Sequence, residues 1–458
     1  MGPCSTLSSC VAAMTSAISP ATRLAGECRC ESGVNERQRL IRGAQVVTPH
    51  GVSENDILIQ GEWIVAVSPG LSSSGAEVLD AEGLYALPGV VDAHVHFRDP
   101  GATHKEDFTT GSQAALAGGV TTVLDMPNTP VPTVSAEAFE QKVAIAAPKS
   151  CCDFGLLIGA TAGNASQAAA VGGAAGLKLY MGSSTGSLLL ADLKSQQLHF
   201  AAYPPDRPLA IHGEDEEAVR LFSEGERRPP ICAELAVTRA IALARRNRRH
   251  LHVCHVSTRA ELDAIALARS QGVRATCEVA THHLFLSQDD EAGLGALAIM
   301  NPPLRSPDEV EGLWQRLDQF DMVASDHAPH TLAEKRSATP PAGVPGVETS
   351  LPLLFDAALQ GRLGLPRLAA LTAANPAAIY HLPHKGQIAA GFHADIVLLD
   401  PQGQTVLGER LFTKCGWTPY AGRRLRGHIV RVLLRGSDAF VDGEVVAQPG
   451  SGRFVSPR

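Results

Sequence analysis

The chain has 458 residues, of which 45% are hydrophobic and 19% are charged, and its formal net charge is −8. This composition is typical of a globular protein with enough apolar material for a large core. The acidic balance and the lack of basic blocks interleaved with aromatic residues argue against nucleic acid as a partner. No apolar run is long enough to cross a bilayer, which argues against a membrane partner.

The first 39 residues differ in composition from the rest of the chain. Residues 1–26 contain no Asp or Glu and are rich in Ser, Thr and Ala, which suits an organellar transit peptide. A disordered extension without a targeting signal is the alternative. Six of the ten cysteines are scattered beyond this segment, which predicts reduced thiols rather than a disulfide framework. We therefore expect a cytoplasmic protein, with a plastid or mitochondrial location as the alternative.

Short strand-like segments occur near both ends of the remaining chain. In residues 40–87 they are separated by turn formers and lie at 41–47, 56–60, 63–67 and 76–80. In residues 385–446 they lie at 394–399, 430–434, 439–441 and 444–446. Neither group is large enough for a core of its own. Together they predict one small β-sandwich domain formed by both termini, followed by a tail at 447–458.

Between these ends, in residues 88–384, strand-like and helix-like segments alternate. The apolar runs number eight and lie at 90–97, 120–126, 153–159, 176–181, 209–212, 251–256, 274–280 and 322–325. Helical patterns separate them, for example at 105–117, 136–147, 216–223, 233–244, 259–269 and 307–317. Eight such repeats predict an α/β fold, a (β/α)8 TIM-like barrel, whose chemistry takes place where the strands end.

Polar side chains fall at the predicted ends of these strands. His94 and His96 are two apart on a strand and therefore point to the same face, where two imidazoles form half a metal site. An isolated pair of this kind is more often hydrogen-bonded structurally at the exit of a buried strand. The metal interpretation is favoured here because other strands carry ligand-type residues at the same level: Lys178, His212, His255 and Asp326.

Lys178 is the least expected of these residues, because a charged ammonium inside a barrel strand carries a large desolvation cost. A free amine in that position could add carbon dioxide and form a carbamate with two anionic oxygens. The plainer alternative is a lysine that reaches the rim or pairs with an acid. The surrounding histidines favour the carbamate, N6-carboxylysine, as a bridge between two metal ions.

These residues predict two Zn²⁺ ions per chain. One would be held by His94, His96 and Asp326, the other by His212 and His255, and carboxylated Lys178 would bridge them. Imidazole and carboxylate suit zinc, although the ligand types do not separate it from manganese or cobalt. Paired ions lower the pKa of a shared water and polarise a carbonyl oxygen. Asp326 would serve as the general acid and base.

Further residues have the chemistry of substrate contacts. A planar guanidinium suits a carboxylate, and amides offer both a donor and an acceptor, so the predicted contacts are Arg98, Asn128, Asn301 and His330. Asn beside Pro is usually turn chemistry, which is the plainer interpretation of both asparagines. Cys254 and Glu278 also follow strands and could line the site or add a further ligand. The glycine-rich residues 182–187 predict a mobile lid or, equally, an inert surface loop.

With these residues in hand, the chain resembles the cyclic amidohydrolases and, within them, the dihydroorotases. The resemblance covers most of residues 40–446 and rests on motifs at 92–98, 178–180, 252–256 and 325–331. Within that family, the chain most resembles the dihydroorotase region of the animal multifunctional pyrimidine-synthesis protein. The motifs that carry this likeness lie at 101–108, 282–287, 417–419 and 441–443.

The resemblance implies reversible closure of N-carbamoyl-L-aspartate to (S)-dihydroorotate in the biosynthesis of pyrimidines. It also implies the metal and substrate residues named above, each of which is filled as the family pattern asks. The alternatives are an allantoinase, a dihydropyrimidinase-type cyclic amidase, or a non-catalytic scaffold. A homodimer and an association with other enzymes of the pathway are implied by analogy.

Overall fold

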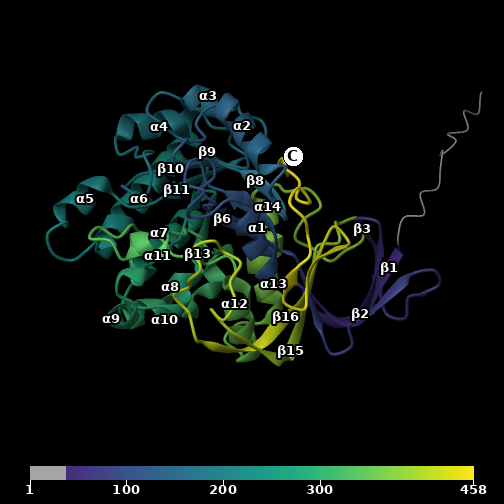
Figure 1. Ribbon diagram of the computed structural model, residues 1–458. Helices are drawn as coiled ribbons and strands as arrows, with labels where there is room; N and C mark the ends of the chain where they lie inside the picture. Colours follow the sequence, from purple (N-terminus) through teal and green to yellow (C-terminus); the bar gives the residue numbers. More distant parts are fainter. Residues whose placement is uncertain (1–37) are drawn as a thin grey trace, which may run out of the picture. The chain divides into compact units, whose positions relative to one another are not determined.

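The computed structural model of the chain describes residues 38–458 (Figure 1). The extension predicted at 1–39 lies outside these residues, except for Gln38 and Arg39, which begin the first strand. Within the described part, no helix combines the length and the apolar character needed to cross a membrane.

Strands from both ends of the described chain share one mixed sheet. β5 pairs antiparallel with β15, which joins strands from the two ends of the described chain in one sheet. The strand order is β18-β17-β16-β15-β5-β1-β2-β3, and β4 pairs with β1. The strands are β1 (Gln38–Thr48), β2 (Gly51–Gln60), β3 (Trp63–Ser68), β4 (Glu77–Asp80), β5 (Tyr85–Pro88), β15 (Ile396–Val406), β16 (Arg424–Leu434), β17 (Ser437–Val441) and β18 (Glu444–Val445).

Two features of this sheet differ from the sequence analysis. β5 is a separate strand that the sequence pattern does not predict, because its four residues run directly into the next apolar segment. The β15–β16 hairpin is longer than the apolar runs at 394–399 and 430–434, since its outer half is only partly buried and lacks a continuous hydrophobic pattern.

The middle of the chain forms parallel strands. β6 pairs with β7 and β7 with β8, and a second ladder runs from β9 to β14 in sequence order. The first and last of these strands also meet, because the amide of His96 donates to the carbonyl of His327 at 2.8 Å. The strands are β6 (Val90–Val95), β7 (Val120–Asp125), β8 (Asp153–Leu156), β9 (Ile158–Gly159), β10 (Leu177–Tyr180), β11 (Pro208–His212), β12 (His250–Val253), β13 (Ala275–Ala280) and β14 (Met322–Ala324).

Helices connect these strands, and side-chain caps fix where several of them begin. Asp107 accepts from the amides of Thr109 and Thr110, so the first helix starts later than the apolar pattern predicts. The helices are α1 (Phe108–Ala117), α2 (Ala136–Ala146), α3 (Ala165–Ala169), α4 (Leu193–Ala202), α5 (Glu216–Leu221), α6 (Pro230–Asn247), α7 (Arg259–Ser270), α8 (Thr281–Phe285), α9 (Glu291–Leu294), α10 (Pro307–Gln315), α11 (Leu332–Lys335), α12 (Ser350–Leu359), α13 (Leu365–Ala369) and α14 (Asn375–Ile379).

The last residues of the chain pack against the parallel strands. The amide of Phe154 in β8 donates to the carbonyl of Arg453 at 2.9 Å, and the amide of Val455 donates to the carbonyl of Phe154 at 2.8 Å. The ring of Phe454 contacts those of Phe139 and Phe154. The segment expected as a tail therefore extends the ordered structure.

A buried charge cluster joins the sheet to the parallel strands. Nζ of Lys385 lies 2.5 Å from Asp153 at the start of β8 and 2.6 Å from Asp395 beside β15. Arg435 pairs with the same Asp153. The two cations lower the pKa of Asp153 against the opposing effect of burial, so its carboxylate stays charged.

We expect Lys385→Met to lower the free energy of unfolding by about 3–5 kcal/mol, because two buried carboxylates would lose their shared partner. Urea unfolding at pH 7 measures this change. The matched control is Arg410→Met, which breaks the exposed pair with Glu444 and should change stability little. Equal effects of the two substitutions would contradict a stabilising role for the cluster.

Candidate metal centre and substrate pocket

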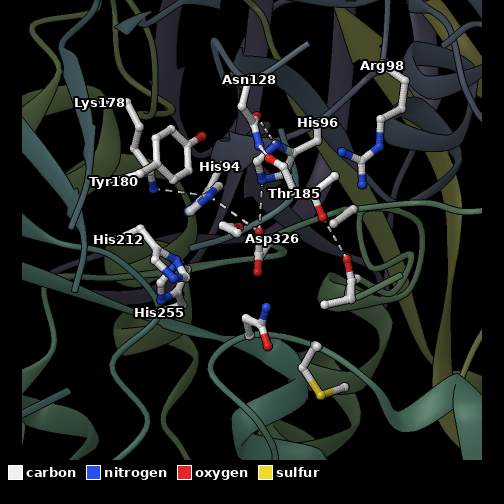
Figure 2. Close-up of a pocket in the computed structure, with 16 residues that line it drawn as sticks. His94, His96, Arg98, Asn128, Lys178, Tyr180, Thr185, His212, His255 and Asp326 are labelled. Atoms are coloured by element: carbon white, nitrogen blue, oxygen red, sulfur yellow. Dashed lines mark hydrogen bonds and ion pairs between the residues drawn. The ribbon is translucent and has the colours of Figure 1, made fainter. Parts of the chain in front are cut away.

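Nine of the ten predicted site residues line one pocket at the carboxyl ends of the parallel strands (Figure 2). His94 and Lys178 lie within strands, His212 ends β11, and the others follow their strands by a few residues, except Asn301, which lies in the irregular segment before α10. The tenth residue, His330, contacts this group through Arg98. The pocket residues among the predictions are His94, His96, Arg98, Asn128, Lys178, His212, His255, Asn301 and Asp326.

The backbone is strained at three of these positions. Arg98, His255 and Asp326 have φ values of 63°, 36° and 45°, in the left-handed region that residues other than glycine rarely adopt. Such strain persists only where the surrounding structure holds it, and it is concentrated at functional sites. Here it turns the side chains of all three residues into the pocket.

Hydrogen bonds fix the tautomer of His96. The amide nitrogen of Asn128 donates to the carbonyl of Thr185 at 2.8 Å, which orients the amide oxygen towards His96. Nδ1 of His96 donates to that oxygen at 2.7 Å, so its Nε2 carries the lone pair. This lone pair lies 3.2 Å from Oδ1 of Asp326. Two acceptors face one another, and a cation between them would satisfy both.

His94 reaches the same carboxylate. Its Nδ1 donates to Glu278 at 2.5 Å, and its Nε2 therefore presents a lone pair 3.4 Å from Oδ1 of Asp326. Burial lowers the pKa of both His94 and His96, which keeps the rings neutral. His94, His96 and Asp326 thus form a group whose ligand atoms lie within 4.8 Å of one another.

A second pair of imidazoles lies across the pocket. Nε2 of His212 donates to Glu214 at 3.1 Å, which leaves the lone pair on Nδ1. That atom lies 3.0 Å from Nε2 of His255. Burial lowers the pKa of both histidines, so two neutral rings face one another. The structure therefore places the residues predicted to hold the second ion side by side.

Lys178 lies between the two groups and is fully buried. Its Nζ is 2.9 Å from the sulfur of Cys254 and 3.4 Å from Nε2 of His94, and it lies over the ring of Tyr180. Among the described residues, no carboxylate or carbonyl oxygen hydrogen-bonds this ammonium. Burial raises the pKa of the Cys254 thiol, so the sulfur is a neutral and weak partner.

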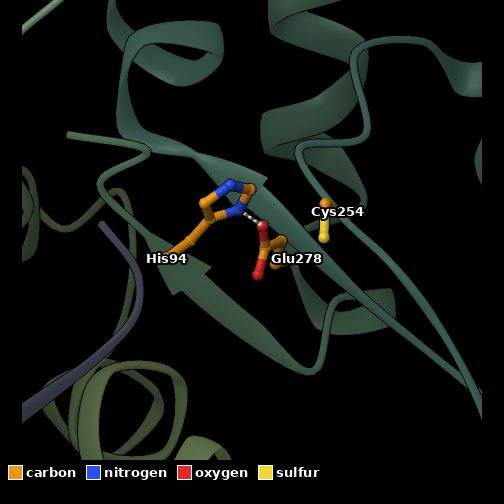
Figure 3. Close-up of side chains that lie close together, drawn as sticks. All are labelled: His94, Cys254 and Glu278. Carbon is orange, nitrogen blue, oxygen red and sulfur yellow. Dashed lines mark hydrogen bonds and ion pairs between the residues drawn. The ribbon is translucent and has the colours of Figure 1, made fainter. Parts of the chain in front are cut away.

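Glu278 supports the first group from behind. Besides His94, its carboxylate accepts from Nε2 of His252 at 3.0 Å and from the amide of His255 at 3.2 Å. Figure 3 shows that it faces His94 and lies close to Cys254, and the ligand atoms of these three residues also lie within 4.8 Å of one another. The carboxylate of Glu278 therefore orients the ring of His94 and also holds the backbone at His255, just after β12.

Arg98 and His330 form the opposite side of the pocket. Nζ of Lys105 donates to Nδ1 of His330 at 3.1 Å, and Nε2 of His330 therefore carries the proton and donates to the carbonyl of Ala342 at 3.1 Å. Burial and the charges of Arg98 and Lys105 lower the pKa of His330 to about 2, so the ring is neutral. Nη2 of Arg98 lies 3.3 Å from a nitrogen that cannot accept, and it is free to donate to a ligand.

Several pocket residues were not found from the sequence. Tyr180 lines the pocket with a buried hydroxyl that has no partner among the described residues, and Glu214 orients His212. Arg227 donates to the side-chain oxygen of Asn301 at 2.8 Å. Glu214 lies two residues after a predicted ligand, a spacing that could have identified it. Thr185, from the glycine-rich loop, also lines the pocket, whereas the mobility of that loop stays a prediction.

The amidohydrolase family model matches residues 85–437. The chain is 40% identical over 417 residues to the dihydroorotase of Halobacterium salinarum, covering 86% of this chain and 94% of that protein. It is 36% identical over 446 residues to the allantoinase of Rubrobacter xylanophilus, with 92% and 97% covered. It is also 37% identical over 382 residues to the multifunctional protein CAD of Squalus acanthias, where it matches 82% of this chain but spans only 16% of that protein.

Among solved structures, the L-hydantoinase (dihydropyrimidinase) from Arthrobacter aurescens is similar, with a TM-score of 0.86 and 28% identity. The match covers 91% of this chain and 99% of that structure.

We expect Glu278→Gln to weaken zinc binding by about 10–100-fold, because His94 would lose the charged acceptor that orients its ring. Titration with a competing chelator measures the affinity. Glu261→Gln is the matched control, since Glu261 is equally buried but caps α7 away from the pocket. Unchanged zinc affinity in Glu278→Gln would show that this carboxylate does not orient a ligand.

Proposed function

The chain belongs to the amidohydrolase family, and we propose that it is a dihydroorotase, which reversibly closes N-carbamoyl-L-aspartate to (S)-dihydroorotate in pyrimidine biosynthesis. The family model and the dihydroorotase-named relatives support a hydrolase that acts on cyclic amides. One observation supports dihydroorotate as the specific substrate. Nη2 of Arg98, beside the neutral ring of His330, has an N–H free to bind a carboxylate, and it lies across the pocket from the proposed metal ligands.

We also propose that the parallel strands close into a (β/α)8 barrel over residues 88–384, with a small β-sandwich domain from 40–87 and 385–446. The sequential strand order and the hydrogen bond from His96 to His327 support closure. The pairing of β5 with β15 supports a terminal domain made from both ends.

The donor set fits two divalent ions. His94, His96 and Asp326 would hold one ion, His212 and His255 the other, and Lys178 as a carbamate would bridge them. Carbamate formation from the ammonium joins Nζ to the carbon of carbon dioxide and releases two protons, one to give the free amine and one on its addition, so an anion takes the place of a buried cation. Two bound ions would supply Lewis-acid polarisation of a carbonyl and a more nucleophilic water. Zinc suits these ligands.

The chain's own residues supply binding and proton transfer. The guanidinium of Arg98 would bind the carboxylate that remains outside the ring, with Asn128, Asn301 and His330 around it. Asp326 would take the proton from the attacking nitrogen during ring closure and give it to the departing oxygen. In the reverse direction it would protonate the ring nitrogen as the amide bond breaks.

The external carboxylate separates this proposal from its rivals. Allantoin and dihydrouracil share the cyclic amide but lack this group, and they would leave Nη2 of the buried Arg98 without an acceptor, which is costly. A non-catalytic scaffold would have no need for four neutral imidazoles beside an unpaired lysine. These arguments favour dihydroorotate as the substrate.

We further propose a cytoplasmic homodimer that can associate with other enzymes of pyrimidine synthesis. The match to a region of a multifunctional protein supports such an association. The helices α4 and α6, which contact each other, expose the apolar side chains of Leu193, Leu198, Ile231 and Leu235, which suits a subunit interface.

We expect zinc-loaded protein to interconvert carbamoyl-aspartate and dihydroorotate, and Lys178→Ala to lose both activity and most bound metal. Absorbance of dihydroorotate and elemental analysis of the same samples measure the two quantities. Turnover of allantoin or dihydrouracil in place of dihydroorotate would rule out the assignment. Absence of bound metal together with absence of turnover would support the scaffold instead.

We expect Arg98→Met to raise the KM for dihydroorotate by about 100-fold, because a charged hydrogen-bonding partner of the carboxylate is lost. Metal content should stay within error of the unaltered protein, since Arg98 contacts none of the proposed ligands directly. Steady-state kinetics and elemental analysis provide the test. A variant with unchanged KM would remove Arg98 from the binding site.

A further inference from the structure

Lys335 is a second fully buried lysine near the pocket, at the end of α11. Its Nζ donates to three backbone carbonyls, those of Ile299 at 2.9 Å, Pro341 at 3.0 Å and Gly343 at 3.1 Å. An ammonium has three N–H donors, and all three are used. Burial and the charge of Arg227 lower the pKa of Lys335 to about 8, which leaves the ammonium as the main form at neutral pH.

The three carbonyls belong to two segments that line the pocket. Ile299 precedes Met300 and Asn301, and Pro341 and Gly343 flank Ala342, so each segment contributes lining residues. The segments also bind each other, because the amide of Gly343 donates to the carbonyl of Ile299 at 2.9 Å. Lys335 therefore joins two walls of the pocket from behind, without reaching the pocket itself.

A third element is fixed by the same arrangement. α11 begins directly after His330, with a capping box in which Thr331 and Glu334 satisfy each other's backbone amides. The indole of Trp417 donates to the carbonyl of His330 at 2.7 Å, and its ring lies under Nζ of Lys335. His330 in turn donates to the carbonyl of Ala342. Displacement of Lys335 would therefore release the segments that carry Asn301 and His330 together.

We propose that Lys335 is a positioning residue that sets substrate affinity by holding the segments of Asn301, Ala342 and His330 in register. This role rests on the proposed function, because these segments form the side of the pocket that would receive the substrate's carboxylate. Five of the six proposed metal ligands lie in or follow other strands, and Asp326, which follows the same strand as His330, is next to His327, whose carbonyl accepts from the amide of His96 at 2.8 Å. Lys335 therefore acts on substrate binding and leaves the metal centre intact.

The test compares Lys335→Met in the zinc-loaded full-length protein with Lys385→Met, a matched substitution of a buried lysine outside the pocket. For Lys335→Met we expect the KM for dihydroorotate to rise about 10–100-fold, while kcat and zinc content change little. Hydrogen exchange should accelerate at the backbone amides of the non-proline residues within 299–304 and 339–344, including that of Gly343. Lys385→Met should lower stability and leave KM and this local exchange unchanged.

Lys335→Gln keeps N–H donors on a shorter, uncharged side chain, and its KM should lie between those of the Met variant and the unaltered protein. It also provides the measurement if the Met variant does not fold. Unchanged KM and unchanged local exchange in both variants would overturn the proposal, as would a loss of kcat that follows a loss of zinc. If the unaltered protein does not turn over dihydroorotate, the proposed function fails, and the exchange data alone decide whether Lys335 holds the two segments.

Discussion

The site depends on one electrostatic constraint: lone pairs of two histidines point at the same carboxylate oxygen, and no hydrogen atom lies between them. Nε2 of His94 and Nε2 of His96 both face Oδ1 of Asp326, at 3.4 Å and 3.2 Å. Neutral rings and a carboxylate at these distances gain nothing from one another in a buried pocket. The arrangement becomes favourable when a cation lies among them, which is why this donor set indicates a metal centre.

Hydrogen-bonding side chains behind the histidines orient these rings towards the pocket. Asn128 and Glu278 take the Nδ1 protons of His96 and His94, and Glu214 takes the Nε2 proton of His212. Each acceptor thereby turns a lone pair towards the pocket. The left-handed backbone at His255 and Asp326 adds the final orientation at two strand ends. The pocket is therefore preorganised by hydrogen bonds and backbone strain, and the free energy for this order comes from the surrounding packed strands.

The sequence predicted that most of the site residues lie together, and their individual roles stay predictions. Alternating apolar runs located the strands, and strand ends in a parallel arrangement lie on one side, so His94, Lys178 and Asp326 could be grouped although they are far apart in the chain. Lys335 could not be identified in this way, because its partners are carbonyls of irregular segments and leave no side-chain pattern. β5 could not be predicted for a related reason: its four residues adjoin another apolar run and show no hydrophobic periodicity of their own.

A comparison of the buried lysines gives the strongest argument about Lys178. Among the described residues four lysines are buried, and three have oxygen partners. Lys142 contacts Asp125 and the carbonyl of Met126, Lys385 contacts two aspartates, and Lys335 contacts three carbonyls.

Lys178 differs, because its nearest atoms are the sulfur of Cys254 and a nitrogen of His94. The same chain that satisfies every other buried ammonium with oxygen leaves this one with weak, neutral partners. A cation in that setting is disfavoured, whereas an anionic carbamate would be stabilised by cations bound at the flanking histidines. The weakly partnered lysine and the converging acceptors therefore support the same proposal, because a carbamate and bound metal ions would satisfy both.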